Sequence, residues 1–159
     1  MTHPPTGDVA LRDVIDDDLP ILFEHQLDPE ATRMAAFPAR PRDAFMAHWA
    51  KIRADPTVVN RTILLDGQVA GSIACFVQDE KPMIGYWIDR KLWGRGVASR
   101  ALALLLAQLP ARPLYAYVAK HNAGSLRVLQ KCGFVIRGED SWAAVEGGPT
   151  TEEWFLRLD

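Results

Sequence analysis

The sequence has 159 residues, of which 48% are hydrophobic and 24% are charged. This composition is typical of a globular protein with a sizeable core. A formal net charge of -2 gives no reason to expect nucleic acid or an anionic membrane as a partner. Cys75 and Cys132 are the only cysteines, and no leader-like segment precedes the first element. We therefore predict one cytoplasmic domain, residues 1–159, in which residues 1–7 form a loose arm.

The N-terminal part alternates short elements with loops. Val9–Arg12 is expected to be a strand, and Leu19–Gln26 a helix that the Asp16–Asp18 triplet caps. Three prolines between Asp28 and Arg42 indicate a loop with room for one helical turn. Apolar residues at helical spacing predict a second helix at Asp43–Ala54.

Three strands then follow in succession, and they are expected to pair as a meander. Val58–Leu65 and Gln68–Val77 flank Asp66-Gly67, a strong indication of a two-residue hairpin. A second turn at Asp79–Pro82 leads into the fourth strand, Met83–Ile88.

From Met83 to Gln108 a strand, a Trp93–Gly96 turn and an apolar helix follow each other. Such a turn leaves unpaired N–H groups at the positive end of the helix dipole, where a phosphate or pyrophosphate can bind. Taken alone, the two glycines fit a plain tight turn equally well. A dinucleotide-binding fingerprint lies after the first strand and has an acidic residue at the end of the next strand. This turn follows the fourth strand, and the next strand ends without an acidic residue, which argues against such a fingerprint. A Walker phosphate loop would need a Gly-Lys-Ser/Thr ending, and none is present.

The C-terminal part completes the sheet. Leu114–Val118 is a fifth strand, which the preceding helix joins to the fourth in a right-handed parallel crossover. Asn122–Cys132 is expected to be a helix with Asn122 as N-cap and Gly133 just beyond its end. The strands Phe134–Gly138 and Glu153–Leu158 follow, with a loop at Glu139–Thr151 between them. The result is an α/β sandwich around a mixed sheet.

Two segments together resemble the GNAT superfamily of N-acetyltransferases, and most closely its RimJ/RimL-like branch of ribosomal-protein N-terminal acetyltransferases. The first is Trp93-Gly94-Arg95-Gly96-Val97-Ala98, and the second runs from Lys120 to Phe134 and matches at Asn122, Ser125, Lys131, Gly133 and Phe134. The resemblance covers nearly the whole chain. It implies a mostly antiparallel mixed sheet of six to seven strands, about four flanking helices, and a splayed parallel pair formed by the fourth and fifth strands.

The resemblance also implies a binding site for acetyl-CoA, used as a co-substrate without a metal. Backbone N–H groups from Arg95 to Ser99 would hold the pyrophosphate, and Arg95 and Arg100 would add charge, although Arg100 equally fits a solvated helix face. The strand near Trp87 would pair with the pantetheine amides. The expected coenzyme-binding residues are Trp87, Ile88, Asp89, Trp93, Gly94, Arg95, Gly96, Val97, Ala98, Ser99, Arg100, Asn122 and Ser125.

The expected catalytic groups depart from the common pattern of the family. Leu129 stands where many members carry a tyrosine acid, and leucine cannot donate a proton. Ser125 is the nearest residue that could replace the tyrosine as a hydrogen-bond donor to the coenzyme sulfur. Alternatively, Ser125 only helps Asn122 to cap the helix. Tyr117 stands where some relatives carry a glutamate base; it would line the acceptor pocket or relay a proton through water, unless it is a packed aromatic. Other candidate bases are Glu24, His25 and His121.

The predicted function is therefore transfer of an acetyl group from acetyl-CoA to a primary amine by direct attack in a ternary complex. The acceptor is a small molecule or a protein N-terminus, and Phe37 and Trp142 are candidates to contact it. The alternatives are a catalytically silent coenzyme A-binding module and transfer of a longer acyl chain. The resemblance also allows a homodimer.

Overall fold

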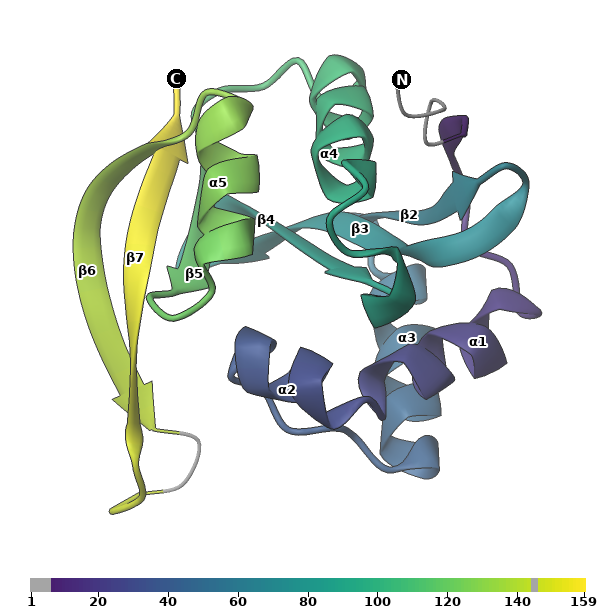
Figure 1. Cartoon of the computed structure of the whole chain (residues 1–159), viewed down its shortest axis with the longest axis horizontal. Helices are drawn as coiled ribbons and strands as arrows, with labels where there is room; N and C mark the ends of the chain where they lie inside the picture. Colours follow the sequence, from purple (N-terminus) through teal and green to yellow (C-terminus); the bar gives the residue numbers. More distant parts are fainter. Residues whose placement is uncertain (1–6, 144–145) are drawn as a thin grey trace, which may run out of the picture.

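Seven strands form one mixed sheet in the computed structural model, which describes residues 7–143 and 146–159 (Figure 1). The strand order is β1-β2-β3-β4-β5-β7-β6. The parallel pair β4 and β5 lies at its centre, and the other neighbours are antiparallel. The strands are β1 (Val9–Arg12), β2 (Val59–Leu65), β3 (Gln68–Gln78), β4 (Lys81–Ile88), β5 (Leu114–Ala119), β6 (Val135–Ala143) and β7 (Thr150–Leu158). Of the predicted loose arm, residues 1–6 lie outside the described residues.

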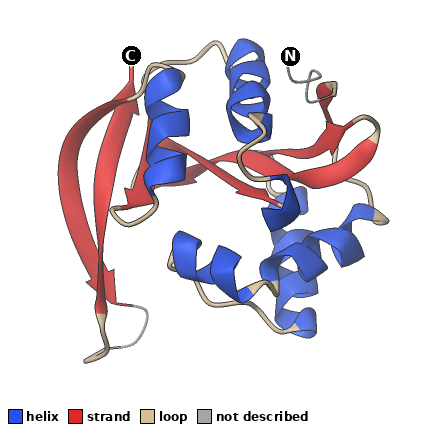
Figure 2. Ribbon diagram, viewed as in Figure 1, coloured by secondary structure: helices blue, strands red, loops and turns tan. Residues whose placement is uncertain are grey.

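Helices cover both faces of the sheet (Figure 2). On one face lie α1 (Asp18–Gln26), α2 (Pro29–Ala35) and α3 (Arg42–Ala54), and on the other lie α4 (Val97–Gln108) and α5 (Ala123–Lys131). A short 3-10 helix, η1 (Arg90–Leu92), follows β4. The larger apolar core lies under α4 and α5 and includes Leu102, Leu105, Leu114, Leu129 and Leu156. The predicted α/β fold with a mixed sheet is thus confirmed.

The parallel pair β4 and β5 diverges almost at once. Only Met83 and Tyr115 are paired between the two strands. Beyond Met83, the edge of β4 that faces β5 therefore has no strand partner. The splay that the resemblance implied is confirmed, and it leaves room in the middle of the sheet.

The segment Asp28–Arg42, predicted as a loop with room for one helical turn, contains the longer helix α2. The Asp28 carboxylate accepts hydrogen bonds from the N–H groups of Glu30 and Ala31, and Pro29 stands in the first turn. Such an N-cap with an adjacent proline favours a helix start. The described residues accordingly contain five α-helices rather than about four.

The predicted loop at Glu139–Thr151 was also wrong for most of its length. β6 continues to Ala143 and β7 begins at Thr150, with Trp142 paired opposite Thr151. Glu139 and Asp140 are polar residues with low strand propensity, so the sequence did not predict a strand here. Pairing with β7 supplies the backbone hydrogen bonds that form it. Similarly, the turn predicted at Asp79–Pro82 is shorter, because β4 already begins at Lys81.

The aspartate triplet before α1 does not cap the helix as predicted. Asp17 is at the N-cap position without a side-chain hydrogen bond, whereas Asp18 is buried. The Asp18 carboxylate accepts two hydrogen bonds from Arg12, at 2.7 and 2.8 Å, and one from Thr62 Oγ1 at 2.6 Å. A buried charge needs such partners, and here they fix α1 to β1 and β2.

Candidate active site

A cavity of about 720 Å³ lies where β4 and β5 diverge. Its walls come from α2, the end of β4, the glycine turn, the N-terminal part of α4 and one side of α5. The residues that line it are Ala31, Met34, Ala35, Tyr86, Trp87, Ile88, Leu92, Trp93, Gly94, Gly96, Val97, Ala98, Ser99, His121, Asn122, Ala123, Gly124, Ser125, Arg127, Val128 and Lys131. The two sequence motifs therefore meet in one cavity.

The glycine turn exposes backbone donors at one end of this cavity. Gly94 and Gly96 have φ angles of 78° and 74°, a left-handed conformation that favours glycine. Gly96 is the N-cap of α4. Within the described residues, no hydrogen bond uses the N–H groups of Gly96 to Ser99. These donors and the helix dipole behind them suit an anion.

The start of α5 forms the facing wall. Asn122 caps the helix as predicted, since its Oδ1 accepts from the Ser125 N–H at 3.2 Å. The Ser125 hydroxyl lies 2.5 Å from the hydroxyl of Tyr86 on β4. Leu129, by contrast, is 2% exposed and belongs to the core. Leu129 therefore has a packing role.

Basic side chains reach the cavity from α5. Arg127 and Lys131 stand four residues apart on one helix face, and both line the cavity. The arginines predicted to contact phosphate do not line it. Arg100 donates hydrogen bonds to the carbonyl oxygens of Gly7 at 2.7 Å and Gly96 at 3.4 Å, and Arg95 is exposed. The basic side chains that line the cavity are thus Arg127 and Lys131, which were not among the predicted coenzyme-binding residues.

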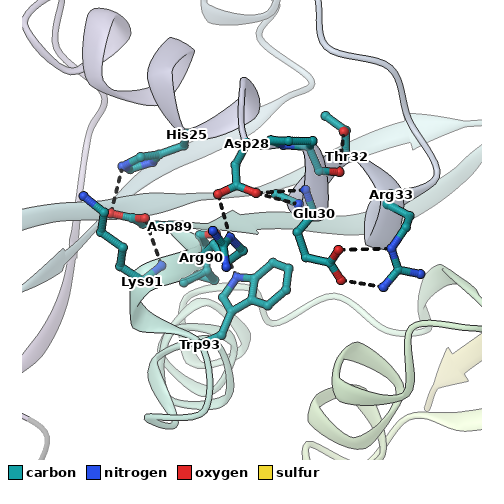
Figure 3. A network of polar contacts seen from close by, with 12 residues as sticks. His25, Asp28, Glu30, Thr32, Arg33, Asp89, Arg90, Lys91 and Trp93 are labelled. Atoms are coloured by element: carbon teal, nitrogen blue, oxygen red, sulfur yellow. Dashed lines mark hydrogen bonds and ion pairs between the residues drawn. The ribbon is translucent and has the colours of Figure 1, made fainter.

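Helix α2 is held against the cavity from two sides. Arg90 Nε, in η1, donates to Asp28 Oδ2 at 2.6 Å, and Figure 3 shows the Asp28 carboxylate between Arg90 and the first turn of α2. His121, just before α5, contacts the carbonyl oxygen of Arg33 through Nε2 at 2.7 Å. One wall of the cavity is therefore anchored to η1 after β4 and to the segment before α5.

Trp93 has a structural role in the same turn. Its indole Nε1 donates to the carbonyl oxygen of Ile88 at 3.0 Å, which fixes the turn to the end of β4. Asp89, which was predicted to bind the coenzyme, does not line the cavity. Its carboxylate accepts from the Lys91 N–H at 3.1 Å and lies 3.6 Å from Nε2 of His25 (Figure 3).

The residues predicted to act as bases or proton relays lie mostly outside the lining of the cavity. Of the predicted bases only His121 lines it, and Glu24 and His25 do not. Burial lowers the pKa of His25, although Asp89 partly opposes this, so His25 is neutral near pH 7. Tyr117 also lies outside the lining and packs against Phe155 at 5.0 Å between ring centroids.

Neither a role for Tyr86 in the site nor the α2 wall was predicted from the sequence. Tyr86 directly precedes Trp87 and Ile88 on β4 and all three line the cavity, so extending the predicted coenzyme-binding segment by one residue would have included it. The contribution of α2 to the cavity could not be predicted from the sequence, because most of this segment was expected to be a loop. Met34 and its neighbours reach the cavity only through tertiary packing.

The described residues lack two further features. No group of three or more His, Cys, Asp or Glu side chains is arranged to hold a metal ion among them. No helix in that part of the chain is long and apolar enough to cross a membrane.

Comparison with known proteins agrees with the geometry. A family model described as "Acetyltransferase (GNAT) domain" matches residues 8–135, which is most of the chain. The chain belongs to the GNAT acetyltransferase family. The comparison with curated proteins gave no match. As a member of this family, the GNAT domain described here is an N-acetyltransferase, as the sequence predicted.

Solved structures share the GNAT fold with this chain. Spermidine N-acetyltransferase from Vibrio cholerae, in complex with CoA and spermine, has a TM-score of 0.81 and 16% identity, with 94% of each chain covered. Mycobacterium smegmatis RimJ, in complex with CoA-disulfide, has a TM-score of 0.78 and 22% identity, with 97% of this chain and 83% of that chain covered. At these identities the likeness concerns the fold.

Proposed function

We propose that this GNAT domain transfers an acetyl group from acetyl-CoA to a primary amine by direct attack in a ternary complex. One observation carries the proposal. The cavity between the splayed strands connects the glycine turn, where an anion would bind, with the hydroxyl of Ser125. A ligand with phosphates at one end and a thioester at the other fits this arrangement.

The residues present suit coenzyme A. The N–H groups of Gly96 to Ser99 would hold the pyrophosphate, and Arg127 and Lys131 would neutralise further phosphate charge. The unpaired edge of β4 near Trp87 would bind the pantetheine amides as an added strand does. Coenzyme A supplies the acetyl group as an activated thioester, and the protein places that thioester beside the acceptor amine.

Three tasks fall to the protein in the transfer. It must receive the amine in its neutral form, because a protonated amine has no lone pair to attack with. A backbone N–H of β4 would stabilise the charge that develops on the carbonyl oxygen. The Ser125 hydroxyl would donate a hydrogen bond to the departing thiolate. The amine releases its proton to water, so no dedicated base is required, although Tyr117 stays a candidate for a water-mediated relay.

The acceptor is a primary amine of a small molecule or a protein N-terminus. The fold shared with a spermidine N-acetyltransferase supports an amine of this class. Phe37 and Trp142, whose ring centroids lie 6.5 Å apart, remain the candidates for acceptor contacts. A cytoplasmic location and a homodimer stay predictions from the sequence.

A thiol-release assay with acetyl-CoA and a panel of small amines and peptides tests the proposal. We expect turnover with at least one primary amine, together with saturable coenzyme A binding by calorimetry. If neither turnover nor coenzyme binding were found, the proposal would be wrong. The panel should include longer acyl donors, because Met34 and the neighbouring alanines of α2 line the cavity that would hold the acyl group.

A second candidate is a catalytically silent coenzyme A-binding module. The burial of Leu129, where many GNAT members carry a tyrosine, favours this candidate. It predicts tight coenzyme binding without turnover on any amine of the panel. The two candidates therefore differ in the turnover alone.

A further inference from the structure

The hydroxyl groups of Tyr86 and Ser125 form a close contact inside the cavity. Their oxygens are 2.5 Å apart, and both residues line the cavity from opposite walls, β4 and α5. Tyr86 Oη also lies 3.4 Å from the Ser125 carbonyl oxygen, a much weaker contact. Tyr86 is the only hydrogen-bond partner that the described part of the chain offers to the Ser125 hydroxyl.

The direction of this hydrogen bond follows from the chemistry of the two groups. A phenol is a better donor than an alkyl alcohol and a poorer acceptor. Burial raises the pKa of Tyr86 to about 12, although the hydrogen bond with Ser125 lowers it and Cys132 adds to the rise. Tyr86 therefore keeps its proton at physiological pH and donates a hydrogen bond to Ser125 Oγ.

A serine that accepts from Tyr86 still has its own hydrogen to give. A hydroxyl carries one donor and two acceptor lone pairs, so the two roles do not compete. Ser125 Oγ is held in place by the short contact, and its N–H is held by the Asn122 cap. The hydrogen of Ser125 is thereby left to point into the cavity.

We propose that Tyr86 is a positioning residue, which orients the Ser125 hydroxyl so that it donates a hydrogen bond to the sulfur of coenzyme A. This inference rests on the proposed function, because it assumes that a thioester lies beside Ser125. Tyr86 on β4 thus contributes to stabilising the leaving thiolate, which Leu129 on α5 cannot do. Hydrogen bonds in a chain of this kind also strengthen one another.

The step balances without a net proton from either hydroxyl. The bond between nitrogen and the carbonyl carbon forms, the bond between carbon and sulfur breaks, and its electron pair remains on sulfur. The amine gives one proton to water, and the thiolate takes one proton from water on release. Tyr86 and Ser125 keep their protons and only stabilise the negative sulfur.

The kinetic test uses Tyr86→Phe, Ser125→Ala and the double variant. Ser125→Ala should lower kcat about tenfold to a hundredfold, the range for losing a hydrogen bond to a charged group, and Tyr86→Phe about threefold to tenfold. The KM for acetyl-CoA should change little, because the hydrogen bond strengthens as charge develops on sulfur. The double variant should be no slower than Ser125→Ala, since Tyr86 acts only through Ser125. Tyr115→Phe is the matched control, because Tyr115 lies on β5 outside the cavity lining.

A second readout does not need turnover. The pKa of the thiol of bound coenzyme A can be measured from the ultraviolet absorbance of its thiolate. We expect this pKa to be lowest in the wild type and higher in Tyr86→Phe and in Ser125→Ala. It should rise no further in the double variant. Melting temperatures of all variants show whether the fold is intact.

The outcomes separate this inference from the proposed function. Wild-type turnover with Tyr86→Phe equal to wild type in kcat and in thiol pKa would overturn the inference and leave the proposed function standing. Effects of Tyr86→Phe and Ser125→Ala that add in the double variant would also overturn it, because Tyr86 would then act independently. Absence of coenzyme binding and turnover in the wild type would contradict the proposed function itself.

Discussion

The Arg90 guanidinium lies 2.6 Å from the Asp28 carboxylate and thereby ties the N-cap of α2 to the segment that follows β4. The same carboxylate caps α2 with its other oxygen. One side chain thus starts the helix and fixes it against the cavity. Because different oxygens of Asp28 make the two contacts, substitutions can remove the ion pair with or without the cap.

Asp28→Asn keeps a capping oxygen but loses the ion pair, whereas Asp28→Ala loses both. We expect Asp28→Ala to lower the melting temperature more than Asp28→Asn does. Both should raise the KM for acetyl-CoA or the acceptor, since α2 lines the cavity. Glu30→Gln is the control, because it removes only an exposed pair with Arg33 inside α2. An unchanged KM in Asp28→Ala would show that α2 does not shape the site.

Gly96→Ala should weaken coenzyme A binding. An alanine at a φ of 74° is strained by roughly 1 kcal/mol, so the turn would shift and misplace the N–H groups of α4. Gly67→Ala is a matched control, because Gly67 has a φ of 80° and open space around its Cα but lies in the β2–β3 turn. Both variants should lose similar stability, and calorimetry should show weaker coenzyme binding for Gly96→Ala alone. Equal coenzyme affinities would contradict the assignment of the turn.

Arg127→Gln and Lys131→Gln should each raise the KM for acetyl-CoA roughly threefold, by removing one charge at a partly screened distance from phosphate. The KM of each variant should also depend less on salt concentration than that of the wild type. Arg137→Gln changes the net charge equally, and Arg137 pairs with Asp159 away from the cavity. The same change of KM in this control would point to net charge rather than to a phosphate contact.

We expect the free energy of unfolding to fall at acidic pH because of Asp18. Burial disfavours its charged form, but hydrogen bonds from Arg12, the Ile15 N–H and Thr62 outweigh burial and lower the pKa from 3.8 to about 2. A carboxylate with a lowered pKa in the folded state stabilises that state above its unfolded pKa. It contributes roughly 2 kcal/mol there, and this is lost as the pH falls from about 4 to about 2.

Unfolding in urea at a series of pH values measures this contribution. Asp18→Asn should lower the free energy of unfolding at pH 7 by roughly 2 kcal/mol, since it removes the charge that pairs with the partly exposed Arg12. It should also flatten the fall in stability between pH 4 and pH 2. Asp16→Asn, which removes only an exposed partner of Arg53, should leave that fall unchanged. A wild-type acid transition identical to that of Asp18→Asn would exclude the role of Asp18.

The sequence predicted the order of elements well where local chemistry is strong. The Asp66-Gly67 turn, the glycine turn before α4 and the Asn122 cap each depend on neighbouring residues, and the structure shows all three. Predictions failed where partners distant in sequence decide. The polar strand β6 exists because β7 pairs with it, and Asp18 is buried because Arg12 and Thr62 meet it there.

By itself, the sequence determined the family and the conformation of the glycine turn before α4, because glycine conformation and helix capping are local properties. Only the tertiary structure decided which side chains face the cavity. It brought Tyr86 within 2.5 Å of Ser125, placed Leu129 in the core and added α2 as a wall. These contacts join residues up to 39 positions apart in the hydrogen bond of Tyr86 and 88 in that of His121. Spacing along the chain carries no information about such pairs, since the packing of helices on the splayed sheet creates them.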